Sequence, residues 1–159
     1  MHTEHKIEVE VPRQRLWQFL MDVPVMATCI PGVESVEALD DNAYKGKLKV
    51  SVGPISTRFD GRVDVVETDD LAFHASLKAS GSDNRLASRV NAHMTMALNE
   101  ISSSASEIVI HTDLAIIGKL GEFGQPFLGR KANDLMKEFS ARLRKKLESQ
   151  EPRIESPVL

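Results

Sequence analysis

The sequence predicts an α+β domain in which a curved, seven-stranded antiparallel sheet wraps round a long C-terminal helix. Three observations predict this fold. Apolar and polar residues alternate from about residue 33 to residue 114, as in antiparallel strands with one buried face. A helical period follows residue 118, and two short helical segments follow the first strand. A sheet with one apolar face must cover it, and only the last helix is large enough to do so.

The N-terminal elements follow from changes of period. Ile7, Val9 and Val11 alternate with two glutamates and predict the first strand. After Pro12, four large apolar residues lie on one stripe at helical spacing and predict a short amphipathic helix: Leu16, Trp17, Phe19 and Leu20. The segment VMATCI between Pro24 and Pro31 predicts a second helix of a single turn.

We expect six strands in the alternating region from Val33 onward. Four turn signals lie within it: Gly53-Pro54, Asp69-Asp70, the segment 80–84 and the segment 101–106. Beyond Gly118, apolar residues on one face predict a helix of roughly 28 residues, about 42 Å long at 1.5 Å per residue. Pro126 lies inside this pattern, so we expect a kink or a late restart near residues 124–126.

Size and composition are those of an ordinary folded domain. The chain has 159 residues, of which 42% are hydrophobic and 27% charged. We expect a single domain over residues 1–150 and a flexible tail over residues 151–159. The net charge of −3 gives no reason to expect nucleic-acid binding. Cys29 is the only cysteine, which excludes an internal disulfide, and no apolar run is long enough to cross a membrane. We expect a cytoplasmic protein, with peripheral contact at the inner face of the membrane left open.

A strongly curved sheet that grips one helix tends to leave an apolar hollow, and such hollows bind ligands. The predicted lining consists of inward-facing residues and the rim of a tight turn: Ile30, Pro31, Phe59, Met94, Met96, Leu114, Phe123 and Phe127. Met suits irregular, adaptable surfaces. The alternative is that each of these side chains is ordinary core. Strand register decides between the two, and sequence does not fix it.

Four glycines crowd the start of the last helix: Gly118, Gly121, Gly124 and Gly129. Glycine weakens a helix by about 1 kcal/mol per residue, so this is its softest stretch. One interpretation is a portal that opens to admit a long ligand. The other is close packing of the helix on the sheet.

The polar residues give little support for catalysis. His93 is predicted on a strand next to that of His111 and Asp113, and either of these two could lie directly opposite it. The three side chains could hold a metal or simply form a solvated outer face. A row of lysines, Lys45, Lys47 and Lys49, is expected to be a solvated face as well. We interpret Cys29 as a small buried hydrophobe, and the carboxylates that can be placed lie on the outer face or in turns. We therefore expect no enzymatic activity.

Four segments carry a resemblance to a known family. They are VPRQRLWQFLMD (11–22), CIPGVESVE (29–37), YKGKLKVSVGPISTRFDGRV (44–63) and GKLGEFGQPFLG (118–129). The order of elements is similar to the helix-grip arrangement of the START-like (SRPBCC) superfamily. On these motifs the chain resembles the CoxG family of carbon monoxide dehydrogenase subunits from about Lys6 to Leu147.

The resemblance implies an accessory role. Such proteins accompany molybdenum hydroxylases of the carbon monoxide dehydrogenase type, are implicated in tethering that enzyme to the membrane, and handle a lipophilic quinone in an apolar cavity. The implied ligand is a quinone or another isoprenoid lipid, with no metal or covalent cofactor. Many relatives carry a hydrophobic C-terminal anchor; this chain shows no apolar tail before Leu159, so in place of stable anchoring we expect either transient membrane contact or binding to the partner in solution. Two alternatives are a ligand-free docking or assembly scaffold for the enzyme and a START-like cyclase or hydrolase.

Overall fold

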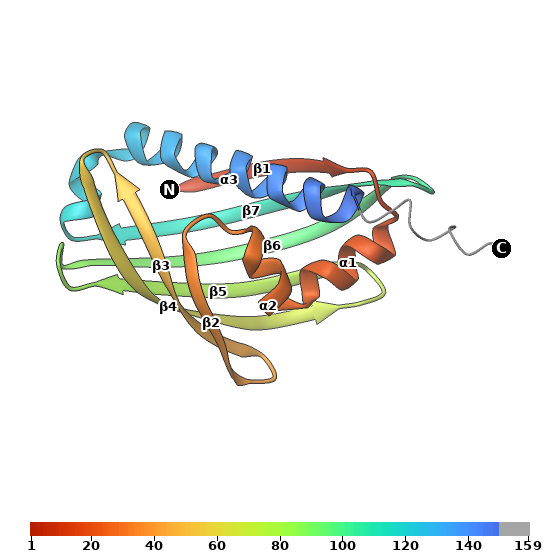
Figure 1. The fold of residues 1–159 in the computed structure, drawn as a ribbon, viewed down its shortest axis with the longest axis horizontal. Helices are drawn as coiled ribbons and strands as arrows, with labels where there is room; N and C mark the ends of the chain where they lie inside the picture. Colours follow the sequence, from red (N-terminus) through yellow and green to blue (C-terminus); the bar gives the residue numbers. More distant parts are fainter. Residues whose placement is uncertain (150–159) are drawn as a thin grey trace.

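The chain starts with a strand, passes through two short helices into six further strands, and continues into a long helix (Figure 1). This computed structural model describes residues 1–149. The strands are β1 (His2–Val9), β2 (Val33–Asp40), β3 (Ala43–Val52), β4 (Ile55–Asp69), β5 (His74–Asp83), β6 (Ser88–Ser102) and β7 (Ala105–Ile117). The α-helices are α1 (Arg13–Met21), α2 (Val23–Met26) and α3 (Gln125–Glu148), and the 3₁₀ helices are η1 (Ala27–Cys29) and η2 (Lys119–Phe123).

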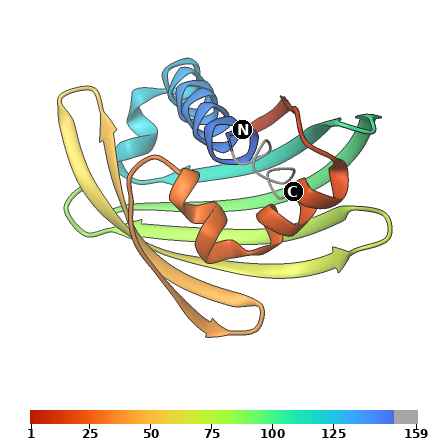
Figure 2. The same cartoon turned by 45° about the vertical axis from the view of Figure 1, so that its right-hand side comes forward.

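All seven strands belong to one antiparallel sheet, in the order β1-β7-β6-β5-β4-β3-β2. Strands β2 to β7 are neighbours in chain order, and β1 closes the series by pairing with β7. The sheet is curved, and the helices lie on its concave side, with α3 beside β1 (Figures 1 and 2). This confirms the predicted fold.

The strand register brings the apolar positions of neighbouring strands together on the concave face, which we call the inner face. Ile108 of β7, for example, lies between Ile7 of β1 and Leu98 of β6. All three are buried, whereas the residues that flank each of them along its own strand face outward. The alternation in the sequence therefore reports directly which side of each strand the helices cover.

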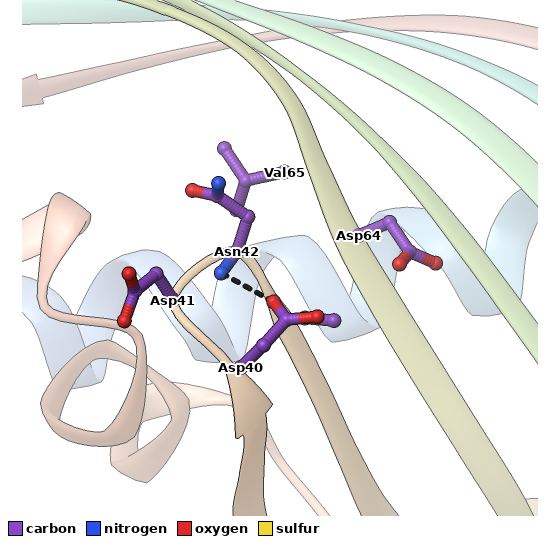
Figure 3. Close-up of a pocket in the computed structure, with 6 residues that line it drawn as sticks. Asp40, Asp41, Asn42, Asp64 and Val65 are labelled. Carbon is purple, nitrogen blue, oxygen red and sulfur yellow. Dashed lines mark hydrogen bonds between the residues drawn. The ribbon is translucent and has the colours of Figure 1, made fainter.

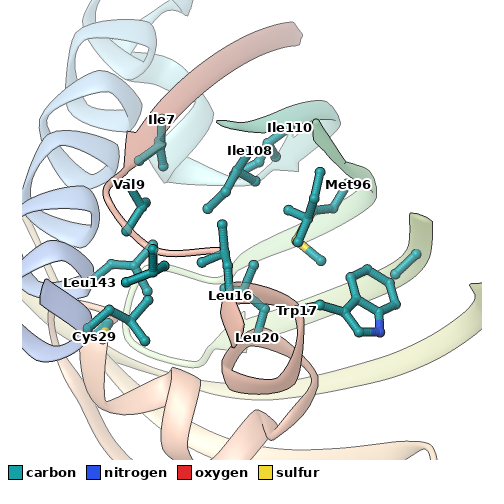
Figure 4. Close-up of a cluster of buried hydrophobic side chains, with 14 residues drawn as sticks. Ile7, Val9, Leu16, Trp17, Leu20, Cys29, Met96, Ile108, Ile110 and Leu143 are labelled. Carbon is teal, nitrogen blue, oxygen red and sulfur yellow. The ribbon is translucent and has the colours of Figure 1, made fainter. Parts of the chain in front are cut away.

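The buried side chains form two separate clusters at opposite ends of the inner face. The major cluster (Figure 4) joins β1, β5, β6, β7, α1, η1 and the C-terminal part of α3: Ile7, Val9, Val11, Leu16, Trp17, Leu20, Cys29, Ala75, Met96, Leu98, Ile108, Ile110, Leu143 and Leu147. The minor cluster has three buried members, Val52, Phe59 and Leu120, and half-buried side chains packed against them. The middle of the domain lies between these clusters.

The C-terminal helix begins later than its apolar pattern suggests. Residues 119–123 form η2, Gly124 adopts a φ of +86° that side-chain-bearing residues avoid, and α3 starts at Gln125. Pro126 lies in the first turn of α3, where its missing N–H breaks no helical hydrogen bond. Of the two predicted outcomes, the structure shows the late restart, and α3 has 24 residues.

The sequence pattern predicts a loop over 80–84, but β5 continues to Asp83, because Asp83 still pairs with Ser88 across the hairpin. The predicted flexible tail, residues 151–159, lies outside the described residues.

Candidate functional site

Five inward side chains form a continuous row across the middle of the sheet. The register places Tyr44 beside Val63, Val63 beside Ala79, Ala79 beside Ala92, and Ala92 beside Leu114. We call these five the central row. All five are half-buried, and none belongs to the major or the minor cluster. The helices therefore cover the middle of the inner face only in part.

A row of glycines runs beside the central row on three of the same strands. Gly46, Gly61 and Gly81 are direct neighbours in register. A Cβ at Gly46 would lie 2.3 Å from the Ser35 carbonyl oxygen, so glycine is required there for β2 to approach. A Cβ at Gly61 would meet only two backbone oxygens, at 3.6 and 3.8 Å, and no side chain within 4 Å. A Cβ at Gly61 would therefore fit on the inner face without a steric clash.

The first turns of α3 also present small residues. A Cβ at Gly129 would meet no atom within 4 Å outside its own helical surroundings, and the half-buried Ala132 follows one turn later. Farther along the helix, Leu143 and Leu147 fill the major cluster. Side-chain volume is thus low in the middle of the domain on both the sheet and the helix, which is how a fold leaves space for a ligand.

Three of the predicted lining residues lie outside both clusters. Leu114 is a member of the central row. Ile30 and Pro31 follow η1, and both are half-buried. The turn that they begin is fixed by Gly32, whose φ is +90° and whose Cβ would collide with the Lys49 carbonyl oxygen at 2.3 Å. Glycine in this turn is a structural requirement.

The other predicted lining residues belong to the clusters. Met96 is part of the major cluster, and Met94 packs against it from a half-buried position. Phe59 is a buried member of the minor cluster. Phe123 and Phe127 stack with ring centroids 5.4 Å apart and pack on the same cluster, half-buried. These residues bound the middle of the domain at its two ends.

Sequence reasoning missed most of the central row, namely Tyr44, Val63, Ala79 and Ala92, together with Gly61. The sequence prediction selected large apolar side chains, whereas Gly61, Ala79 and Ala92 are small. The available signal was the presence of Gly61, Ala79 and Ala92 at inward positions of adjacent strands. Inward small residues on neighbouring strands mark a place where the core is not filled.

The four glycines before and within α3 differ in their constraints. A Cβ at Gly118 would lie 2.1 Å from the Ala87 carbonyl oxygen, and one at Gly121 would lie 3.3 Å from the Ile116 carbonyl oxygen. These two positions reflect close packing. Gly124 is required by its positive φ, and Gly129 is sterically free. The portal interpretation is therefore restricted to the segment from Gly124 onward.

A buried carboxylate, Asp83, fixes the hairpin that supports η2. Thr57 Oγ1 donates to Asp83 Oδ1 at 2.5 Å, and the backbone N–H groups of Arg85 and Leu86 donate to the same carboxylate at 3.1 and 2.8 Å. Burial would raise the pKa of Asp83, but these hydrogen bonds outweigh it and the pKa lies below its usual value. The sequence interpretation, which placed carboxylates only outside or in turns, was wrong for Asp83, since β5 extends to it.

The same hairpin holds η2 through Ser88. The Leu120 N–H donates to Ser88 Oγ at 2.9 Å, and Ser88 Oγ donates to the Leu86 carbonyl at 3.2 Å. Together with the close approach at Gly118, these bonds anchor η2 to the hairpin, and Gly124 follows η2 as the residue that joins it to α3.

Cys29 is fully buried in the major cluster. Burial raises the pKa of its thiol, although Lys146, Thr28 and Arg142 act in the opposite direction. A protonated, inaccessible thiol is a poor nucleophile. Cys29 acts as a packing residue.

The polar outer face is internally paired. His93 lies opposite Asp113 and His111 opposite Thr95, so of the two predicted partners of His93 the structure shows Asp113. Asp113 accepts from His2 Nδ1 at 2.7 Å. Within residues 1–149, no group of three His, Cys, Asp or Glu side chains is arranged to hold a metal ion.

Two members of the predicted lysine row also have acidic partners on this outer face. Lys47 Nζ lies 2.9 Å from Asp60 Oδ1, and Lys45 Nζ lies 3.7 Å from Glu37 Oε2. The row is therefore partly neutralised by carboxylates of the neighbouring strands, as a solvated face would be.

Two shallow surface hollows lie away from the inner face. One, at the β2–β3 turn, is lined by Asp40, Asp41, Asn42, Asp64 and their neighbours (Figure 3). Its carboxylates suit water better than an apolar ligand, and Asp40 is already engaged by the Asn42 N–H at 2.8 Å. The other lies on the solvent side of α1, beside the bond from Trp17 Nε1 to Asp70 at 3.0 Å. Neither contains a residue of the central row.

Comparison with known proteins identifies the family. The model of the carbon monoxide dehydrogenase CoxG family matches residues 6–148. The chain belongs to this family. Membership places it among accessory proteins associated with carbon monoxide dehydrogenase. No curated protein matches the chain closely enough to add a relative of known role.

Solved structures confirm the fold of this CoxG-family protein. A conserved protein from Geobacillus kaustophilus is 23% identical, with a TM-score of 0.86, and the match covers 94% of this chain and 96% of that one. A START superfamily protein from Mycobacterium smegmatis has a TM-score of 0.69 at 10% identity, covering 94% and 98%. The ZhuI aromatase/cyclase from Streptomyces sp. R1128 has a TM-score of 0.68 at 17% identity, covering 93% of each chain. At these identities the likeness concerns the fold alone. In the part of the CoxG-family chain that the structure describes, no helix meets the length and hydropathy needed to span a bilayer.

Proposed function

We propose that this protein binds a lipophilic small molecule, a quinone in the first instance, on behalf of a molybdenum hydroxylase of the carbon monoxide dehydrogenase type. The observation that carries the proposal is the central row, five inward side chains that stay half-buried between two complete clusters. Family membership supplies the enzyme partner, and the family resemblance suggests the quinone.

The proposed mechanism is burial of the ligand, without a chemical step. Half-exposed apolar side chains on the inner face remain in contact with water at a cost in free energy, and an isoprenoid tail would cover them. Each buried methylene contributes roughly 0.8 kcal/mol, so a short tail along the central row suffices for useful affinity. The small residues Gly61 and Gly129 leave space on the sheet and on the helix for such a tail.

The proposed entry route passes beside the N-terminal half of α3. The structure gives this half one side-chain hydrogen bond to the sheet among the described residues, between His5 Nε2 and Asn133 Oδ1 at 2.8 Å. Gly124 supplies a joint directly before the helix. Displacing the first turns of α3 would widen access to the central row while Leu143 and Leu147 stay packed in the major cluster.

We further propose transient contact with the inner face of the membrane, where a quinone would be collected. One surface suited to this combines Val25, which is 40% exposed on α2, with basic residues at the end of α3. Lys146 reaches this region, since its Nζ donates to Thr28 Oγ1 at 2.6 Å. Apolar and basic side chains together favour an anionic lipid surface.

The first experiment is native mass spectrometry of the purified protein, followed by organic extraction and identification of any bound lipid. We expect a defined adduct, either as isolated or after incubation with quinone-loaded vesicles. A mass that stays that of the bare chain under both conditions would contradict ligand carriage. The docking scaffold would then be the better explanation of the family role.

A matched pair of variants locates the ligand. Gly61→Ile places a side chain on the inner face at a position where a Cβ meets no clash, so we expect at least a tenfold loss of quinone uptake with the fold retained. Ser80→Ile adds the same side chain to the outer face of the neighbouring strand and should leave uptake unchanged. Equal uptake by both folded variants would exclude the central row as the binding site.

A further inference from the structure

Three polar side chains interrupt the apolar inner face at its β1 side. Thr3, His5 and Thr112 occupy inward positions, with Thr3 directly opposite Thr112. Thr112 lies two residues from Leu114 on β7, so this group adjoins one end of the central row. We call these three the polar strip.

His5 carries an unmet hydrogen-bonding requirement. Its Nδ1 is the one buried side-chain nitrogen or oxygen within residues 1–149 that has no hydrogen-bond partner. A buried polar atom left unpaired costs about 1–3 kcal/mol, so folded proteins rarely retain one without a reason. A ligand group that bonds this atom would recover that cost.

The Asn133 contact determines what His5 can offer. Asn133 Oδ1 can only accept, so His5 Nε2 is the donor across 2.8 Å, and in the neutral tautomer that matches this bond the proton is on Nε2. Nδ1 is then left as an acceptor. It can pair with a hydroxyl group of a ligand but not with a carbonyl oxygen.

The two threonines add adaptable partners beside His5. Both are half-buried, and neither makes a side-chain hydrogen bond among the described residues. Each hydroxyl can donate or accept. Apart from His5, the inward side chains of β1 and β7 are of uncharged types, and the Met1 ammonium donates to the Leu114 carbonyl at 2.7 Å. The threonine hydroxyls and His5 Nδ1 therefore offer hydrogen-bonding partners for the hydroxyl groups of a ring.

We propose that the polar strip binds the hydroxyl-bearing head of an isoprenoid hydroquinone, with its tail along the central row. The inference rests on the proposed function and adds to it an orientation and a preference for the reduced ligand. His5 is the residue that distinguishes a hydroxyl from a carbonyl. A protein with this preference would release the oxidised ligand more readily than the reduced one.

Three probes that share a decyl tail and differ only in the ring test this on the unmodified protein: decylhydroquinone, decylbenzoquinone and decylbenzene. Their dissociation constants are measured by anaerobic equilibrium dialysis from cyclodextrin. A wholly apolar site would bind decylbenzene most tightly, because it has the least polar head. The polar strip reverses this order, and we expect decylhydroquinone to bind about tenfold more tightly than decylbenzoquinone, as one additional hydrogen bond allows.

Variants then assign the preference to residues. His5→Phe keeps a ring of similar size without the acceptor, and should make the hydroquinone and the quinone bind equally. Thr112→Val should weaken the hydroquinone a few-fold and leave decylbenzene unchanged. Thr95→Val makes the same change on the outer face of β6 and should alter nothing.

The outcomes separate this inference from the proposed function. If all three probes bind and decylbenzene binds best, or if folded His5→Phe keeps the preference, the polar strip is not the head site while ligand carriage stands. If no probe binds, both proposals fail together. Should His5→Phe not fold, the probe order measured on the unmodified protein still decides the matter.

Discussion

The two halves of α3 are held by the rest of the domain in different ways. In the C-terminal half, Leu143 and Leu147 are buried in the major cluster. Arg144 Nε donates to the Glu8 carbonyl at 2.9 Å, and Glu148 Oε2 accepts from the Glu10 N–H at 2.9 Å. Between residues 125 and 139 no side chain is fully buried, and the side-chain hydrogen bond that ties this stretch to the sheet is the His5–Asn133 bond.

This difference indicates that one helix has two roles: its C-terminal half stabilises the fold, and its N-terminal half borders the proposed ligand site. The C-terminal half contributes its apolar face to the larger core, as expected for the main stabilising helix. The N-terminal half has no fully buried side chain, and its half-buried residues pack at the edges of the major and minor clusters; it follows Gly124 directly. Local opening costs least where buried contacts are few, so the two halves are expected to differ in their free energies of opening.

The largest expected effect comes from the buried half. Leu143→Ala removes a fully buried side chain from the major cluster and should lower the free energy of unfolding by about 3 kcal/mol. Leu135→Ala, the matched change in the half-buried N-terminal part, should cost less than about 1 kcal/mol. Urea denaturation followed by circular dichroism measures both. Equal losses would mean that the two halves contribute alike and that the comparison is wrong.

The next largest effect concerns Asp83, which holds the hairpin that supports η2. Asp83→Asn removes charge-assisted hydrogen bonds from a buried carboxylate and should cost about 2 kcal/mol at neutral pH. Because the pKa of folded Asp83 is lowered, its stabilisation is complete above the pKa of the unfolded carboxyl, about 3.9. It is lost as the pH falls through the lower folded pKa.

Urea midpoints between neutral pH and strongly acidic pH test this sign. The gap between the unmodified protein and Asp83→Asn should be constant at neutral pH and should shrink below about pH 4. A gap that widens on acidification would show that Asp83 is not held as a carboxylate by its donors.

The smallest effects come from two glycines on either side of the start of α3. Gly124→Ala forces a side chain into a φ of +86° and should destabilise the protein by about 1–2 kcal/mol. Gly129→Ala meets no steric obstacle and improves helix propensity, so it should stabilise by up to about 1 kcal/mol. Thermal unfolding of both variants gives the two signs. A destabilising Gly129→Ala would indicate that the space beside α3 is already filled.

Hydrophobic periodicity predicted the fold well because an antiparallel sheet with one covered face shows its geometry in the order of residues. The strand containing Val63 and the face containing Leu143 both follow from that pattern. The boundaries were harder, because they depend on backbone conformation at single residues. Gly124 converts one long apolar pattern into η2 followed by α3, and pairing with Ser88 extends β5 to Asp83.

The candidate site was less predictable from sequence. Whether Leu114 and Met96 belong to the same environment depends on which residues lie beside them on other strands, and the structure puts them in different ones. The room beside Gly61 depends on small residues at inward positions of several strands and of the helix together. His5 became notable only when a buried nitrogen without a partner could be identified.

The position of the helix anchor also determines when the protein can fold. The bonds from Glu148 to the Glu10 N–H and from Arg144 to the Glu8 carbonyl span 138 and 136 positions of the chain. The larger core therefore cannot close during translation until the last turns of α3 have left the ribosome. The pairing of β1 with β7 also joins the first strand to the last, so this topology has a high contact order. We therefore expect a low folding rate for a domain of this size. An unfinished chain would keep a long sheet edge unpaired, so it is the nascent form that has most need of a chaperone.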